Sequence, residues 1–113
     1  SYNNIVDANA AWVIANDFAE PTVSVIKHAN PCGLASNTDL TEAYLRAYNG
    51  DTVSAFGGIV GLNRPVTLAV AEAMRQIFYE VIVAPSYEAD ALALLRKKRD
   101  LRLLEVSRSE ESS

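Results

Sequence analysis

The chain has 113 residues, about one domain's worth, with 50% apolar residues and a formal net charge of −4. This acidic balance, with one basic run at Arg96-Lys97-Lys98-Arg99, argues against a nucleic-acid partner. No apolar run approaches the roughly 20 residues that span a bilayer, so we expect no membrane association, and a lone cysteine fits a reducing cytoplasm.

The two ends of the chain suggest a segment of a longer protein. The sequence opens at Ser1 without an initiator methionine, and it closes with the polar stretch SRSEESS. We expect residues 1–106 to form one partial domain. Residues 107–113 are expected to form a polar, disordered tail, because they offer nothing apolar to bury.

The first predicted elements are a helix, a strand and a turn. Apolar residues recur at helical spacing after Asp7, a suitable N-cap, which predicts a helix over Asp7–Glu20. Thr22–Lys27 (TVSVIK) is short and rich in β-branched residues, as strands are. Asn30–Gly33 (NPCG) then predicts a tight turn before a brief return strand at Leu34-Ala35.

The middle of the chain predicts a helix, a strand and a second helix. Asp39 and Glu42 have capping-box spacing, and Gly50 is expected to close that helix in the left-handed conformation. Gly57–Leu62 (GGIVGL) predicts a buried strand entered through two glycines. Thr67 is expected to cap the next helix, whose inward side chains are Val70, Ala73, Met74, Ile77 and Phe78.

The last predicted elements repeat this alternation. Glu80–Ala84 (EVIVA) predicts a buried strand, Ala89–Lys98 a helix with a basic last turn, and Leu101–Val106 a final strand. Helices that alternate with apolar strands are typical of a sheet covered on both faces. We therefore predict a three-layer αβα domain of the α/β class.

The stretch Ile26–Gly33 (IKHANPCG) holds the single histidine and the single cysteine of the chain. A zinc deaminase signature needs glutamate and a second cysteine where Asn30 and Ala35 stand, so we expect no metal site. Cys32 is a weak candidate nucleophile, because a cysteine after proline in a turn is often merely small and half-buried. The pair Lys27-His28 could combine a cation with a proton acceptor, or could simply end a strand.

Two further positions are candidates for ligand contact. The glycines Gly57 and Gly58 enter a strand, where the missing Cβ atoms let a ligand or another backbone approach. The plainer interpretation is a β-bulge or crowded packing. Glu80 begins an otherwise apolar strand, where a carboxylate could bind hydroxyls or an amine, or could be a solvated first residue.

Four stretches together are more specific than any one of them: YNNIVDANAAW, VIKHANPCG, SAFGGIVGLNRPV and EVIVAPSYEADAL. In this order they closely resemble the transformylase part of the bifunctional purine biosynthesis enzymes over residues 2–106. That family pairs AICAR transformylase (phosphoribosylaminoimidazolecarboxamide formyltransferase) with IMP cyclohydrolase. The resemblance implies transfer of a formyl group from 10-formyltetrahydrofolate, a co-substrate, to the 5-amino group of AICAR, followed by ring closure to IMP.

The resemblance also assigns residues by matching position. It implies that Lys27 and His28 are the catalytic pair and that His28, Gly57 and Glu80 contact AICAR, with Asn30 as a supporting candidate. The AICAR amine is a poor nucleophile, so its proton must leave as it attacks the formyl carbon. His28 suits that base role and Lys27 suits the developing oxyanion, but which of them takes the proton stays open.

The resemblance further implies a cytidine-deaminase-like fold without zinc ligands. Lys27-His28 end their strand, whereas Gly57 and Glu80 begin theirs. These residues can meet only if the first strand runs antiparallel to the other two. We therefore expect a mixed sheet, with the first strand in a hairpin through Asn30–Gly33.

Members of this family are several times longer and form homodimers. The cyclohydrolase domain, a second deaminase-like unit and most folate contacts are therefore expected outside this chain, and we expect no transformylase activity from it alone. The alternatives are a free-standing, non-catalytic α/β nucleotide-binding module and a purely structural subdomain. The presence of Lys27, His28, Gly57 and Glu80 together argues against both.

Overall fold

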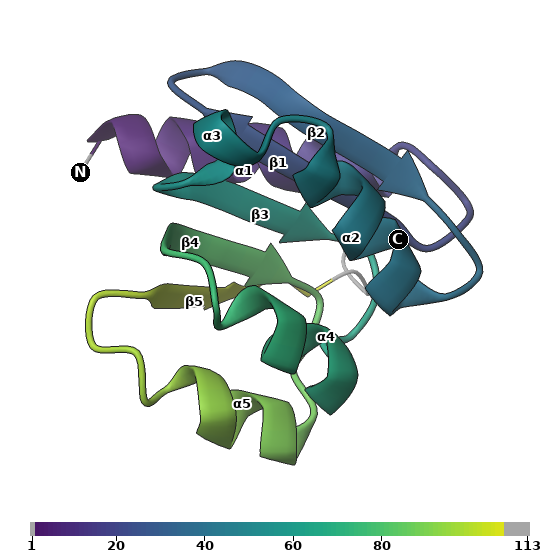
Figure 1. Ribbon diagram of the computed structural model, residues 1–113, viewed down its shortest axis with the longest axis vertical. Helices are drawn as coiled ribbons and strands as arrows, with labels where there is room; N and C mark the ends of the chain where they lie inside the picture. Colours follow the sequence, from purple (N-terminus) through teal and green to yellow (C-terminus); the bar gives the residue numbers. More distant parts are fainter. Residues whose placement is uncertain (1, 108–113) are drawn as a thin grey trace.

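The computed structural model describes residues 2–107, which contain one five-stranded sheet in the order β2-β1-β3-β4-β5 (Figure 1). The strands are β1 (Thr22–Lys27), β2 (Asn30–Ser36), β3 (Gly58–Leu62), β4 (Tyr79–Ala84) and β5 (Arg102–Glu105). The helices are α1 (Tyr2–Asn16), α2 (Leu40–Asn49), α3 (Thr52–Ala55), α4 (Leu68–Met74) and α5 (Ala89–Leu95).

The sheet is mixed, as predicted. Strand β1 pairs antiparallel with both β2 and β3, whereas β3, β4 and β5 run parallel to one another. Ile26 near the end of β1 therefore pairs with Ile59 near the start of β3, and Gly58 pairs with Tyr79 at the start of β4. The end of β1 and the beginnings of β3 and β4 thus share one edge of the sheet.

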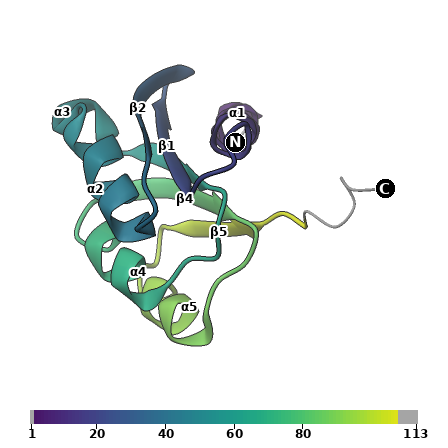
Figure 2. The same cartoon turned by 90° about the vertical axis from the view of Figure 1, so that its right-hand side faces the viewer.

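Helices cover both faces of the sheet, which confirms the three-layer prediction. Figure 2 shows α1 alone on one face, with α2, α3, α4 and α5 on the other. Under α1, the buried side chains are Ala8, Ala11, Trp12, Ile26, Ile59, Val81 and Val83. The larger core on the other face includes Val25, Tyr44, Val60, Met74, Ile82 and Leu95. None of the helices in the described range is long and apolar enough to cross a membrane.

Helix α1 and the following hairpin depart from the prediction in register. The helix spans Tyr2–Asn16, so Asp7 lies in its middle instead of at its N-cap. The hairpin exists, but its turn consists of His28 and Ala29, because Lys27 already pairs with Asn30. The predicted turn Asn30–Gly33 therefore lies inside β2, which begins earlier than expected.

The ends of α2 differ in part from expectation. Asp39 caps the helix as predicted, by accepting a hydrogen bond from the Thr41 N–H. Glu42 does not complete a capping box, because its carboxylate pairs with Arg46 at 2.9 Å. Gly50 is in the right-handed helical conformation (φ −59°), so the predicted left-handed cap is wrong. A Cβ there would lie 3.3 Å from the Ala47 carbonyl oxygen, a tight contact that does not exclude a side chain.

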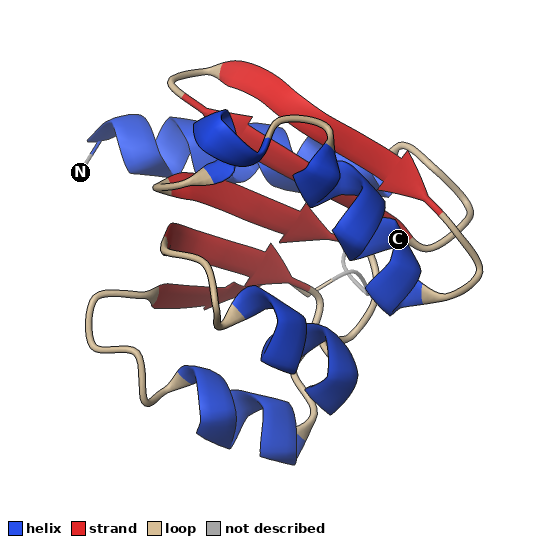
Figure 3. Cartoon of the chain, in the orientation of Figure 1, coloured by secondary structure: helices blue, strands red, loops and turns tan. Residues whose placement is uncertain are grey.

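The remaining differences concern the lengths of short elements (Figure 3). Helix α3, which was not predicted, is a single turn that Asp51 caps by accepting a hydrogen bond from the Ser54 N–H. Thr67 caps α4 as predicted, but the helix ends at Met74, so Ile77 and Phe78 belong to the connection to β4. Of the predicted tail at residues 107–113, all but residue 107 lies outside the described residues.

Candidate functional site

An open cavity of about 630 Å³ lies at the sheet edge where β1 ends and β3 and β4 begin. Four of the five residues that the family resemblance assigns to a site line it: Lys27, His28, Gly57 and Glu80. The other lining residues are Asn4, Val6, Asp7, Ile26, Ala29 and Ile59. The antiparallel arrangement of β1 brings these segments together, because it reverses the end of β1 onto the starts of its neighbours.

Asn30, the fifth residue that the resemblance assigns, lies outside this cavity. It is the first residue of β2, and its side chain is exposed. Its backbone pairs with Lys27 across the hairpin. Adjacency in sequence to His28 and Ala29 therefore does not make Asn30 a lining residue of the cavity.

The turn that carries His28 has a strained backbone. His28 and Ala29 both have positive φ values, 53° and 64°. A two-residue hairpin turn with both central residues in this region has type I′ geometry, which favours Asn-Gly and similar pairs. For residues with a Cβ the left-handed conformation costs about 1–2 kcal/mol each. This turn therefore needs support from its surroundings, and such support is common where backbone strain serves a function.

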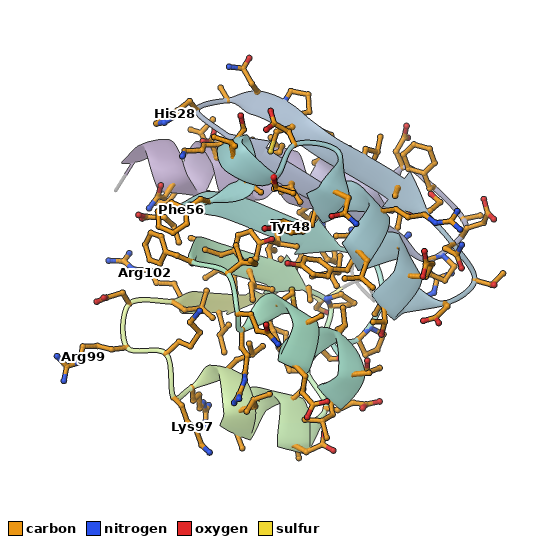
Figure 4. The ribbon with its side chains drawn as sticks, viewed as in Figure 1. His28, Tyr48, Phe56, Lys97, Arg99 and Arg102 are labelled. Atoms are coloured by element: carbon orange, nitrogen blue, oxygen red, sulfur yellow. The ribbon has the colours of Figure 1, made fainter. Side chains whose placement is uncertain are left out.

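Lys27 ties the end of β1 to the loop before β3. Its ammonium group donates a hydrogen bond of 2.5 Å to the Phe56 carbonyl oxygen. Figure 4 shows His28 and Phe56 at the same edge of the molecule. The ring of Phe56 lies 5.3 Å from that of Phe78, measured between centroids. One hydrogen bond leaves the ammonium with further donors for a ligand oxygen in the cavity.

Glycine is required at positions 57 and 58, at the start of β3, for two different structural reasons. Gly57 has a φ of 79°, and its N–H donates to the Phe78 carbonyl oxygen at 2.7 Å. A Cβ on Gly57 would meet Lys27 Nζ no closer than 3.7 Å, so its backbone conformation, and not crowding, requires glycine. A Cβ on Gly58 would lie 2.9 Å from the Ile26 carbonyl oxygen, so packing excludes it. Gly57 is thus the glycine that leaves open space beside the cavity.

Helix α1 supplies two polar groups that the sequence analysis did not assign to the site. Asn4 Nδ2 donates to Glu80 Oε2 at 3.1 Å. Asp7 Oδ2 accepts from the Ala29 N–H at 3.3 Å, and the Asp7 side chain is only 9% exposed. The available signal was that Asp7 is the sole charged residue of Tyr2–Asn16. A buried carboxylate in an otherwise uncharged helix needs a specific partner, because burying an unpaired charge is costly.

Cys32 does not join the cavity lining. It is half-buried on β2, and burial is the main reason that its pKa is raised, followed by the negative charge of Asp51. A raised pKa disfavours the thiolate, which is the nucleophilic form. Within residues 2–107 no cluster of three or more His, Cys, Asp or Glu side chains is placed to hold a metal ion.

Solved structures show the same fold at low sequence identity. The apo dCMP deaminase from the cyanophage S-TIM5 matches with a TM-score of 0.61 and 7% identity, covering 89% of this chain and 96% of that one. Acinetobacter baumannii RibD, form 1, matches with a TM-score of 0.65 and 11% identity, covering 97% of this chain and 36% of that one. The predicted deaminase-like fold is confirmed by these matches.

Curated relatives are far more similar in sequence. The bifunctional purine biosynthesis protein PurH of Lactococcus lactis subsp. lactis (strain IL1403) is 54% identical over 113 residues, which are 100% of this chain and 22% of the relative. PurH of Enterococcus faecalis (strain ATCC 700802 / V583) is 58% identical over 104 residues, 92% of this chain and 20% of the relative. The chain thus spans about a fifth of their length. The protein-family model described as the AICARFT/IMPCHase bienzyme matches residues 1–113, and the chain therefore belongs to that family.

Proposed function

We propose that this chain is part of the transformylase region of a bifunctional purine biosynthesis enzyme. Its role there is to help transfer a formyl group from 10-formyltetrahydrofolate to the amine of AICAR. The observation that carries the proposal is the cavity of about 630 Å³ lined by Lys27, His28, Gly57 and Glu80. These residues come from three separate segments, and an αβα domain does not need them at one edge for its own packing.

The cavity suits a nucleotide with a flat base. Its volume lies within the range of roughly 300–1,000 Å³ that is typical of small-molecule sites. The apolar side chains of Ile26, Ile59 and Val6 offer surface for a heterocycle, while Glu80 offers acceptors for its amine or hydroxyl donors. Gly57 presents no Cβ, so the ring can approach the backbone.

Lys27 and His28 supply the groups that formyl transfer requires. The exposed imidazole of His28 is free to reach an amine in the cavity and to take its proton as it attacks the formyl carbon. The ammonium of Lys27, fixed through the Phe56 carbonyl, places a positive charge beside the oxygen that becomes negative. The formyl carbon then breaks its bond to the tetrahydrofolate nitrogen, which takes a proton as it leaves. Either His28 or Lys27 can exchange that proton, since both line the same cavity.

The formyl donor is held mainly by parts of the enzyme beyond this chain. 10-Formyltetrahydrofolate supplies the formyl carbon when bound, and the open mouth of the cavity leaves one side for it. Formyl transfer by the isolated 113 residues should be undetectable for this reason. A clear rate from the isolated chain would contradict that expectation.

The decisive experiment replaces His28 in the full-length enzyme that carries this segment. His28→Ala should lower kcat for formyl transfer by about 10²–10⁴-fold, the usual effect of removing a general base. The cyclohydrolase rate, measured on the formylated nucleotide, should be unchanged and would show that the enzyme is folded. Formyl transfer within a few-fold of wild type would sink the proposal.

A matched pair of lysine variants sharpens the result. Lys27→Ala removes a cation from the cavity, whereas Lys97→Ala removes an exposed cation just beyond the end of α5, away from His28 (Figure 4). Only the first should slow formyl transfer. If Lys27→Ala and His28→Ala both leave formyl transfer intact, while the isolated chain binds AICAR in calorimetry, the segment is a non-catalytic nucleotide-binding module.

A further inference from the structure

We propose that Asp7 is a positioning residue of this site, whose carboxylate holds the strained turn that carries His28. The consequence for catalysis rests on the proposed function, whereas the contact between Asp7 and the turn does not. Asp7 lies on α1, across the sheet edge from the hairpin, and lines the same cavity as His28. Its hydrogen bond to the Ala29 N–H joins these two elements.

The turn is the part of the site that most needs holding. Neither His28 nor Ala29 is glycine, yet both have positive φ values. The chain could relieve this by opening the hairpin, because a longer loop avoids the left-handed region. Fixing the amide of Ala29 fixes the peptide plane next to His28, so the direction of the imidazole depends on this contact.

The surroundings of Asp7 show that the carboxylate is not there for packing. Its neighbours along the buried side of α1 are Ala8, Ala11 and Trp12, which pack on Ile26 and Ile59. An alanine or leucine at position 7 would bury apolar surface without the cost of removing a charge from water. The cost is offset by the hydrogen bond to the turn, and that bond is of use only if the turn geometry matters.

The same helix also holds the second polar wall of the cavity. Asn4 precedes Asp7 by three residues, so the two side chains lie on one side of α1. Asn4 Nδ2 donates to Glu80 Oε2, while Asp7 accepts from the turn. Helix α1 therefore sets the spacing between His28 on one strand and Glu80 on another.

The test compares four variants of the full-length enzyme: Asp7→Ala, Asp7→Asn, Ala29→Gly and the double variant Asp7→Ala/Ala29→Gly. Asparagine keeps the size and an acceptor oxygen, so Asp7→Asn should retain most of the activity. Asp7→Ala should lower kcat for formyl transfer by up to about 100-fold, the effect of a misplaced catalytic group. KM for AICAR should stay within about twofold, because uniform binding is not removed.

Ala29→Gly in the Asp7→Ala background separates positioning from other roles. Glycine adopts positive φ without a steric cost, so the turn should depend less on Asp7 and much of the lost kcat should return. Asp17→Ala, which removes an exposed carboxylate just beyond the end of α1, is the matched control and should have no effect. A raised KM with unchanged kcat would mean that Asp7 binds substrate directly, and absence of rescue by glycine would overturn the positioning role.

Amide hydrogen exchange gives a readout that is independent of formyl transfer. The peptide that spans β1 and the turn should exchange faster in Asp7→Ala than in wild type, and Asp7→Asn should lie between them. Unchanged exchange would refute the contact. If His28→Ala leaves formyl transfer intact, the proposed function fails, but this exchange comparison still decides whether Asp7 holds the turn.

Discussion

Helices α1 and α2 pack on opposite faces of the sheet and are built on different principles. Helix α2 buries one stripe of Ala43, Tyr44 and Ala47, and its exposed side carries the pair Arg46–Glu42. Helix α1 has no charged residue except the buried Asp7, and it exposes Ile5 at 68% and Val13 at 56%. An ordinary surface helix resembles α2. Helix α1 therefore departs from this pattern, and its one charged residue is explained by its contact with the turn.

The glycine of β3 that lies beneath α1 gives the largest expected effect with which to test this comparison. A Cβ at Gly61 of β3 would lie 2.4 Å from the Ala11 carbonyl oxygen of α1, an overlap with backbone that only a shift of the whole helix relieves. Gly61→Ala should therefore cost about 3 kcal/mol in the free energy of unfolding, at the upper end for overpacking. It should also displace Asp7 and Asn4 from the cavity.

Gly50→Ala, at the end of α2, is the matched control for this variant. The nearest contact of the new Cβ is 3.3 Å, and the backbone is already right-handed helical. The change in stability should stay within about 1 kcal/mol, since alanine also favours the helix. Urea unfolding of both variants measures the difference, and equal losses would contradict the close packing of α1 on β3.

The buried hydroxyl of α2 gives a second prediction, through pH. The Tyr44 and Tyr79 hydroxyl oxygens lie 2.6 Å apart, and burial raises the pKa of Tyr44 to about 12. Burial also raises the pKa of Tyr79. Because an unfolded tyrosine titrates near pH 10, the folded state holds these protons more tightly. The stability they contribute is complete below about pH 10 and is lost as the pH rises toward 12.

The measurement is the thermal midpoint of unfolding between pH 8 and pH 12. Wild type should lose stability steeply above about pH 10, where the unfolded tyrosines ionise. The double variant Tyr44→Phe/Tyr79→Phe should lose less over the same range, because no buried hydroxyl is left to ionise at this place. Parallel curves for the two proteins would show that this pair does not govern the alkaline transition.

The same contrast explains how much of the fold could be predicted. Strands β1, β3 and β4 were found within one residue, because β-branched runs between Gly, Pro and polar residues have few other interpretations. The N-cap of α2 was found from the carboxylate of Asp39. The start of α1 was not found, because Asp7 is a residue type that often caps helices but here accepts its hydrogen bond from the distant Ala29 N–H. Sequence patterns do not distinguish a local acceptor from a distant one.

Four residues of the candidate site were predicted from the sequence, but the residues of α1 that hold them in place were not. Lys27, His28, Gly57 and Glu80 lie where a reversed first strand brings them. That reversal was expected because the family resemblance implies that these residues meet, although two of them end a strand and two begin one. Asn30 lies outside because the turn is two residues long, which the non-glycine pair His28-Ala29 concealed. Asn4 and Asp7 belong to the site through contacts with residues far away in sequence, and sequence spacing does not predict such contacts.

The smallest predicted effects concern two polar interactions of α2, the N-cap at Asp39 and the ion pair between Arg46 and Glu42. Asp39→Ala removes the hydrogen bond to the Thr41 N–H and should cost about 1 kcal/mol in the free energy of unfolding. Arg46→Ala removes the ion pair with Glu42 and should cost no more than about 0.5 kcal/mol, because both side chains are exposed.

Neither change should alter the amide exchange of the turn that Asp7 contacts, since α2 lies on the opposite face from α1. Chemical denaturation combined with that exchange measurement checks both points. Altered amide exchange of the turn in Asp39→Ala would show that the two faces of the sheet are coupled. The distinction between α2, whose polar residues stabilise the helix, and α1, whose polar residues support the site, would then no longer hold.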